Sequence, residues 1–356
     1  MKRMFVQSSC VAAVILCAQM TVTAWDYEGH RLLNRLALAS LPADFPAFVK
    51  VASARERIAF LAGEPDRWRN APDLTLRHCN GPDHYIDIED LELYRLEPAA
   101  LSPLRYQFMA ALAQARASRP ADFPSIDPAK DADRTKELVG FLPWAISEYY
   151  GKLKSGFSYL KALEEGGTAG EIANAQQNVI YIMGVMGHFV GDGSQPLHTT
   201  RHYNGWVGEN PRRYTTNRTF HAWIDGGYFA KVKLQPESLF ARVRPARLLT
   251  GAAPGVHTNI FPTVMNYLTE QFKRVEPLYR LDKEYKLPGK QGVDAEGYEF
   301  MTGQLVVGAQ MLGDLWLTAW HYAPPDTYLK TQLAKRKLAS EGALGDAPSG
   351  NGKSKP

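Results

Sequence analysis

The sequence predicts an all-α fold in a single multi-helix domain, and three observations predict it. Apolar residues recur at spacings of three and four over long stretches, as on the buried face of a helix. Strand-like alternation of apolar and polar residues is scarce. The stretches are joined by segments containing Gly and Pro, and long helices joined in this way favour one helical domain rather than two.

Helical spacing is found in seven stretches, taken here in chain order: Leu32–Leu41, Phe48–Leu61, Leu104–Ala115, Leu138–Leu163, Ile172–Val190, Ile260–Tyr279 and Tyr298–Trp320. Two segments, Asn70–Asp87 and Thr199–Arg218, are rich in Pro, Asp, Asn and Gly and are expected to be irregular. Residues 335–356 contain few large apolar side chains and many Lys, Gly, Ser and Pro, which predicts a disordered tail.

Residues 1–24 have the pattern of a signal peptide. Lys2 and Arg3 form a positive start, and residues 10–18 form an apolar stretch too short to span a bilayer. Small residues at 22 and 24 suit a signal peptidase, so we expect cleavage to leave Trp25 as the first residue. The expected product is a secreted or periplasmic domain of residues 25–334.

The overall charge is too small to attract a polyanion. The whole chain carries a formal charge of +4, and loss of Lys2 and Arg3 would leave +2. Any attraction for an anionic substrate must therefore be local. Cys79 is the single cysteine after residue 24, so that part of the chain can form no intrachain disulfide.

Two His/Asp pairs are the first indication of chemistry. His188 and Asp192 are four residues apart, as are His221 and Asp225, so a helix would place each pair on one face. Neutral imidazole and carboxylate are the ligands that zinc takes when no cysteine is available. A single pair of this kind is more often a hydrogen-bonded core histidine than a metal ligand.

Further His and Asp residues accompany these pairs. His30 lies soon after the expected new terminus, Asp66 and His84 stand next to Gly and Pro residues, and His198 follows Gln195-Pro196-Leu197. Five histidines and three aspartates in such short contexts are difficult to explain as independent core residues. They predict a cluster of metal ligands.

As a set, these residues resemble the single-strand-specific zinc nucleases (the S-one and P-one type), which share a superfamily with bacterial zinc-dependent phospholipase C. The matching elements are Trp25-x4-His30, Asp66-x2-Arg69, His84-Tyr-Ile-Asp87, His188-x3-Asp192-x2-Gln195-Pro-Leu-His198 and His221-x3-Asp225.

This resemblance implies three zinc ions per chain. Asp66, His84, His188 and Asp192 would bind one ion. His30, Asp192 and the α-amino and carbonyl groups of Trp25 would bind the second, and His198, His221 and Asp225 would bind the third. Cleavage before Trp25 would then create a ligand, since an amide nitrogen has no lone pair to offer a metal.

The resemblance also implies residue roles and a reaction. Asp66 and Arg69 would be catalytic, with Arg69 stabilising charge on phosphoryl oxygens. Tyr85, Asp87 and Asn210 would contact the substrate. The expected activity is a nuclease and 3′-nucleotidase acting on single-stranded nucleic acid or nucleotides through a hydroxide bridging two zinc ions.

Two alternatives stay open. A phospholipase C would release phosphorylated headgroups from phospholipids, and a non-catalytic exported protein would use zinc for structure. The short step from Trp25 to His30 and the 23-residue gap from His198 to His221 favour a nuclease. The chain departs from the nuclease pattern at Glu64-Pro65, Asp83, Gly193-Ser194 and Gly208-Glu209, which affects the substrate more than the metals. No stable protein partner is implied.

Overall fold

The computed structural model describes residues 25, 27–249, 259–287 and 292–345. Within these ranges the chain is all-α and contains no strand, as the sequence predicts. No helix in the described ranges combines the length and the apolar character needed to cross a membrane. The expected signal peptide, residues 1–24, lies outside the described residues.

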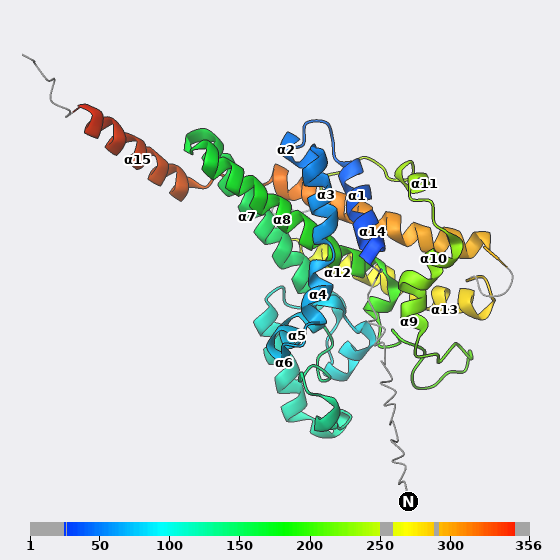
Figure 1. The fold of residues 1–356 in the computed structure, drawn as a ribbon. Coiled ribbons are helices and arrows are strands. Elements are labelled where there is room, and N and C mark those ends of the chain that lie inside the picture. Colours follow the sequence, from blue (N-terminus) through cyan, green and yellow to red (C-terminus); the bar gives the residue numbers. More distant parts are fainter. Residues whose placement is uncertain (1–24, 26, 250–258, 288–291, 346–356) are drawn as a thin grey trace, which may run out of the picture.

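Five long helices form the centre of the fold. They are α1 (Tyr27–Ser40), α3 (Ala52–Leu61), α7 (Leu142–Gly166), α8 (Ala169–Ser194) and α14 (Ala295–His321). Helix α8 packs against all four of the others, and α1 also packs against α3 and α14 (Figure 1). The N-terminus of α8 is capped by a capping box between Thr168 and Glu171.

Glycines on α8 let α1 approach closely enough to bring its histidine to the site. A Cβ at Gly187 would lie 1.7 Å from the Oδ1 atom of Asn34, and one at Gly191 would lie 2.8 Å from the Nδ1 atom of His30. Asn34 Nδ2 donates to the carbonyls of Ile58 and Gly184, which joins α1, α3 and α8. The small residues of α8 thus set the depth at which His30 is buried.

Helices α4 (Glu64–Arg69), α5 (Leu74–Asn80) and α6 (Arg105–Ser118) gather at one end of this bundle (Figure 1). The expectation of an irregular segment over Asn70–Asp87 is wrong in part, because α5 and the 3-10 helix η1 (Gly81–His84) lie within it. The Asp73 side chain accepts a hydrogen bond from Leu76 N at 2.8 Å, a cap that starts α5.

Apart from α15, the other helices of the described residues are η1 and α2 (Ala47–Lys50), η2 (Ile88–Tyr94), η3 (Pro98–Ala100), η4 (Pro120–Asp122), η5 (Pro128–Lys130), η6 (Pro196–Thr199), α9 (Phe220–Ala222), the π-helix η7 (Trp223–Gly227), α10 (Tyr228–Val232), α11 (Glu237–Phe240), α12 (Phe261–Phe272) and α13 (Val275–Lys283). The stretch expected as one helix over Ile260–Tyr279 is divided between α12 and α13. Pro277 explains the division, because it has no N–H to donate to the carbonyl of Lys273. Phe48–Leu61 is likewise divided, at the extended residue Val51.

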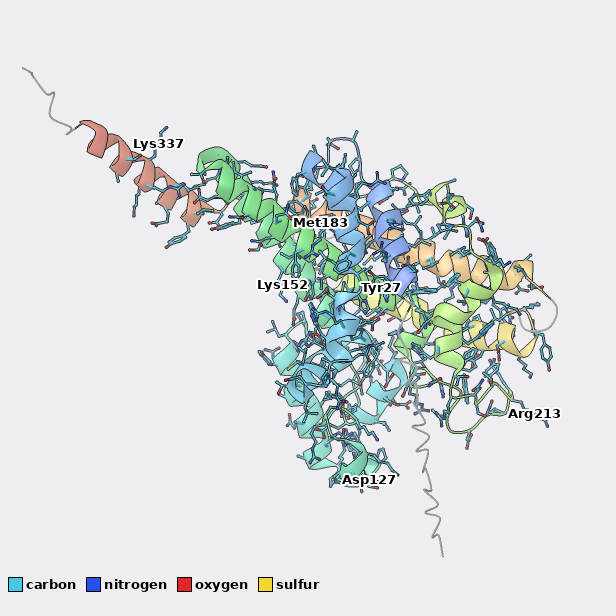
Figure 2. All side chains as sticks on the ribbon, viewed as in Figure 1. Tyr27, Asp127, Lys152, Met183, Arg213 and Lys337 are labelled. Carbon is cyan, nitrogen blue, oxygen red and sulfur yellow. The ribbon has the colours of Figure 1, made fainter. Side chains whose placement is uncertain are left out.

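The C-terminal boundary also differs from the expectation. Helix α15 (Thr327–Gly345) continues eleven residues into the segment expected to be a disordered tail from residue 335, and it projects from the bundle with Lys337 near its outer end (Figure 2). Arg336 pairs with Glu171 at 2.7 Å, and Leu333 is buried against Gly166. These contacts hold α15 against the rest of the protein although the helix is polar. Composition alone therefore gives the wrong prediction of disorder for residues 335–345. Residues 346–356 lie outside the described residues.

Candidate metal centre

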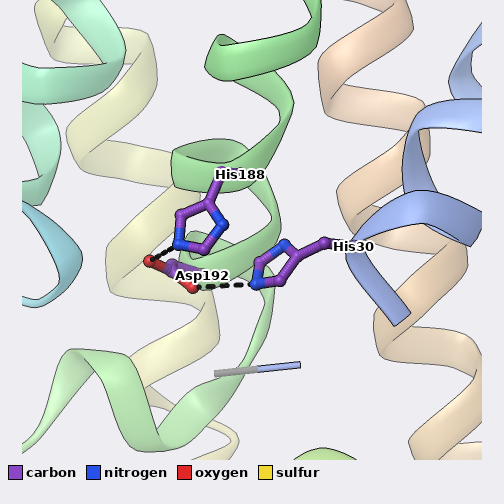
Figure 3. Close-up of side chains that lie close together, drawn as sticks. All are labelled: His30, His188 and Asp192. Carbon is purple, nitrogen blue, oxygen red and sulfur yellow. Dashed lines mark ion pairs between the residues drawn. The ribbon is translucent and has the colours of Figure 1, made fainter. Parts of the chain in front are cut away.

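The first group of candidate ligands joins α8 to α1. His188 and Asp192 lie one turn apart on α8 and are fully buried, as is His30 on α1. The Asp192 carboxylate lies between the two histidines, with Oδ2 3.4 Å from His188 Nε2 and Oδ1 3.5 Å from His30 Nε2 (Figure 3). The two imidazole rings stack with centroids 3.9 Å apart. The group could hold a metal ion.

The second group lies on the other side of the Asp192 carboxylate. His84, at the end of η1, places Nδ1 2.9 Å from Asp192 Oδ2 and 3.0 Å from His188 Nε2. Asp66 of α4 has Oδ1 3.9 Å from His188 Nε2. His188 belongs to both groups, and Asp192 directs Oδ1 to His30 and Oδ2 to His84 and His188, the arrangement of a carboxylate shared between two sites.

The third group is built from the chain after α8. His198 lies in η6, His221 in α9 and Asp225 in the π-helix η7, a turn type often found at functional sites. The Nε2 atoms of the two histidines are 3.1 Å apart, and Asp225 Oδ2 is 3.0 Å from His221 Nε2. Gln195 donates from Nε2 to Asp225 Oδ1 at 2.7 Å, which orients the carboxylate.

Backbone carbonyls determine which nitrogen of three histidines faces the groups. In each of these rings Nδ1 lies within hydrogen-bond distance of a backbone carbonyl oxygen. The distance is 2.7 Å from His188 to Ala62, 2.5 Å from His198 to His84 and 3.2 Å from His221 to Tyr203. A carbonyl can only accept, so Nδ1 carries the hydrogen and Nε2 of the neutral ring presents a lone pair. Hydrogen bonding of this kind commonly orients metal-ligating histidines.

These lone pairs converge on one another and on carboxylate oxygens. Nδ1 and Nε2 of His30, Oδ1 of Asp192 and Oδ2 of Asp225 are buried without a hydrogen-bond partner among the described residues. A buried polar atom left unpaired costs about 1–3 kcal/mol, so four in one region call for an explanation. A cation at the first group would satisfy His30 Nε2 and Asp192 Oδ1, and one at the third group would satisfy Asp225 Oδ2. A donor set of imidazole and carboxylate without sulfur fits zinc.

The titration properties of His84, His198 and Asp66 agree with ligand roles. Burial lowers the pKa of His84 and of His198 to about 3, so both rings are neutral near pH 7. Burial alone would raise the pKa of Asp66, but the nearby Arg69 and histidines outweigh it and hold that pKa below its usual value. Neutral imidazole and ionised carboxylate are the forms that bind metals.

A cavity of about 800 Å³ reaches the third group. Its lining includes His198 and His221, together with Arg69, Tyr85 and Asp87. The Arg69 Nε atom lies 2.8 Å from Asp66 Oδ1, so the guanidinium is held beside the second group while it also borders the cavity. Of the expected catalytic and substrate residues, Arg69, Tyr85 and Asp87 thus line one space, whereas Asp66 contacts it only through Arg69 and Asn210 does not line it.

Asn210 does not lie in this cavity lining. Its Nδ2 atom donates to the carbonyl of Tyr214, and its Oδ1 atom accepts from the N–H of the same residue, both at 2.8 Å. The side-chain amide is therefore used to close its own loop, and the expectation that Asn210 contacts the substrate is not supported.

Trp25 is anchored next to the C-terminal end of α8. Its side chain is fully buried, with Nε1 2.9 Å from the carbonyl oxygen of Gly191 and 3.1 Å from Ser194 Oγ, and its ring packs on Phe229. Both hydrogen-bond partners lie within two residues of Asp192. Metal binding by the α-amino group of Trp25 stays a prediction.

Sequence patterns missed several residues that line the cavity, among them Asn70, Arg77, Lys130, Lys136 and Tyr203. Tyr203 is 52% exposed, and its ring lies edge-on to His221 with centroids 5.9 Å apart. Its position soon after His198 was the only signal that could have pointed to it.

In comparisons with protein-family models, curated proteins and solved structures, nothing matches this chain, so inference about its function depends on the residues and geometry described above.

Proposed function

We propose that the protein is an exported zinc-dependent phosphodiester hydrolase that cleaves single-stranded nucleic acid, with nuclease and 3′-nucleotidase activity. The observation that carries the proposal is the convergence of three buried His/Asp groups, one of which borders a cavity beside Arg69. Export, zinc and substrate are all parts of this proposal.

The residues divide into ligands and a charge donor. The three groups, with the terminus at Trp25, would hold zinc, which supplies Lewis acidity and a nucleophile available at neutral pH. Asp192 would serve two sites through its two oxygens. Arg69, held by Asp66, presents a guanidinium to the cavity, where it can donate hydrogen bonds to phosphoryl oxygens as negative charge develops on them.

An open site favours catalysis over a purely structural role. Structural zinc sites are usually closed by four protein ligands, whereas catalytic sites leave a position for water or substrate. The third group has three candidate protein ligands, and two of them, His198 and His221, line the cavity. This accessibility argues against the alternative of a non-catalytic zinc protein.

Tyr85, Asp87 and Tyr203 support a substrate that contains a base. The tyrosines offer aromatic surface for stacking. Burial, with the carboxylates of Asp90 and Glu89, raises the pKa of Asp87 well above its usual range. A protonated Asp87 can both donate and accept a hydrogen bond, which suits the edge of a base. Aromatic rings beside an acid also suit a quaternary ammonium headgroup, which keeps phospholipase C as the second candidate.

One zinc-loaded sample can decide between the two candidates. We expect release of nucleotides from a single-stranded DNA oligomer and no headgroup release from phosphatidylcholine. Asp87→Ala should lower kcat/KM for the oligomer about 5- to 150-fold, the equivalent of about 1–3 kcal/mol per recognised base, while bis-nitrophenyl phosphate is affected little because it lacks a base.

Asp87→Asn is the matched control, since an amide keeps a donor and an acceptor without a charge. It should retain more of the oligomer activity than Asp87→Ala. Equal loss on both substrates would mean that Asp87 only positions the neighbouring His84. Headgroup release without cleavage of DNA would overturn the nuclease assignment.

A further inference from the structure

Three cations other than Arg69 line the same cavity. Arg77 comes from α5, Lys130 from the end of η5, and Lys136 from the segment that follows. Asp87 and Asp133 are the carboxylates in the lining, so the cations outnumber them there. The wall of the cavity is therefore locally positive, although the chain as a whole is close to neutral.

These cations have little to neutralise them within the protein. Neither Arg77 nor Lys136 forms an ion pair with another described residue, and the Nε atom of Arg77 is buried without a hydrogen-bond partner among them. Lys130 lies 3.5 Å from Asp127, but 76% of the lysine side chain is exposed, and such a surface pair contributes little. A buried guanidinium nitrogen without a partner indicates that an acceptor from outside the chain belongs beside it.

The segment that carries Lys136 is held in place. The buried Asp131 carboxylate accepts hydrogen bonds from Thr135 N at 3.0 Å and from Lys136 N at 3.2 Å. His78 Nδ1 lies 2.6 Å from the Asp133 carbonyl oxygen, a contact that ties α5 to this segment. Arg77 and Lys136 are thus presented from two elements that are connected to each other, which limits the entropy lost when they bind a ligand.

We propose that Arg77, Lys130 and Lys136 form a subsite for a second phosphate group of the substrate, separate from the phosphate that is hydrolysed. This inference rests on the proposed function and narrows its substrate class to nucleotide chains that carry more than one phosphate. A cavity of about 800 Å³ is in the range that holds drug-sized ligands, so it has room for more than a single phosphate group. A positive wall also disfavours a cationic choline headgroup.

The test compares substrates that differ by one phosphate. The zinc-loaded protein is given thymidylyl-thymidine and the same dinucleotide with an added phosphate at its 5′ or its 3′ end, and cleavage of the internal linkage is followed. We expect an added phosphate at one of the two ends to raise kcat/KM about tenfold or more, mainly through a lower KM. The ratio between substrates should fall toward one in the Arg77→Gln/Lys136→Gln variant.

Salt provides a second readout. The slope of log KM for the phosphorylated dinucleotide against log salt should be shallower in the double variant than in the wild type, because salt screens the charge contacts that the substitutions remove. Lys152→Gln is the control, because Lys152 is an exposed lysine on α7 that does not line this cavity (Figure 2). It should leave both the substrate ratio and the salt slope unchanged.

The outcomes separate the two proposals. Cleavage of all three dinucleotides with equal kcat/KM, or a ratio that survives the double substitution, would overturn the phosphate subsite and leave the nuclease assignment intact. Failure of the wild-type protein to cleave any dinucleotide would instead overturn the proposed function, and the subsite with it.

Discussion

Substitution of Gly191 by Ala tests how the fold positions the candidate metal ligands. Gly191 precedes Asp192 on α8, and an added Cβ would lie 2.8 Å from His30 Nδ1, 3.1 Å from His30 Cε1 and 3.3 Å from Leu33 Cδ1. The His30 ring cannot easily move away, since it is fully buried and stacked on His188. To relieve the steric clash with the added Cβ, either helix α1 must shift or the His30 ring must rotate. Either change moves His30 Nε2 relative to the Asp192 carboxylate.

The expected magnitude has two opposing contributions. Alanine in place of glycine within a helix stabilises by about 1 kcal/mol. Overpacking of a buried site costs about 1–3 kcal/mol. We expect Gly191→Ala to be less stable by up to about 2 kcal/mol without metal. It should lose more stability in the presence of zinc, because a displaced His30 weakens one site and with it the stabilisation that binding supplies.

Urea unfolding with zinc and with a chelator, together with elemental analysis, measures both effects. Gly303→Ala is the matched control: it lies within helix α14, and a Cβ there would have no atom within 4 Å other than those of the adjoining helix backbone. We expect the control to keep the wild-type zinc content and to gain up to about 1 kcal/mol with or without zinc. If Gly191→Ala binds as much zinc as the wild type and matches the stability of the control, the argument that α8 glycines position His30 is wrong.

Two further predictions concern charge. Arg69→Ala should retain its zinc while kcat falls by about 10²–10³, the loss typical when one donor to a transition-state charge is removed, and normal turnover would assign Arg69 a structural role only. Burial, with some help from Arg201, lowers the pKa of His202 from its ordinary 6.5 to about 4. The neutral ring thus contributes stability that is complete above pH 6.5 and is lost as the pH falls toward 4, by up to about 3 kcal/mol. Urea unfolding between pH 4 and 7 should show a shallower pH dependence for His202→Gln than for the wild type, and identical slopes would contradict this.

Local patterns were sufficient for the fold class and for much of the candidate site. A helix repeats every 3.6 residues, so apolar spacing identified the long helices, and a spacing of four placed His188 and Asp192 on one face. The division between α12 and α13 was also present in the sequence, as Pro277, but apolar periodicity continued across it and concealed it. Composition predicted a disordered tail where α15 docks through Leu333 and Arg336, because composition does not include the surface that a helix meets.

Tertiary structure alone decided which residues share a space. The sequence determined the helices and the types of the ligands. The approach of His30 to Asp192 required α1 to pack closely on the glycines of α8, and His84 reaches the same carboxylate from η1. Asn210 has the right chemistry for a substrate contact, but both ends of its amide bind its own loop. Arg77 and Lys136 lie about sixty residues apart and have no shared pattern, yet they line one cavity. Periodicity and spacing relate residues that are close in the sequence. A cavity is lined by residues that are distant in the sequence and come together only when the helices pack.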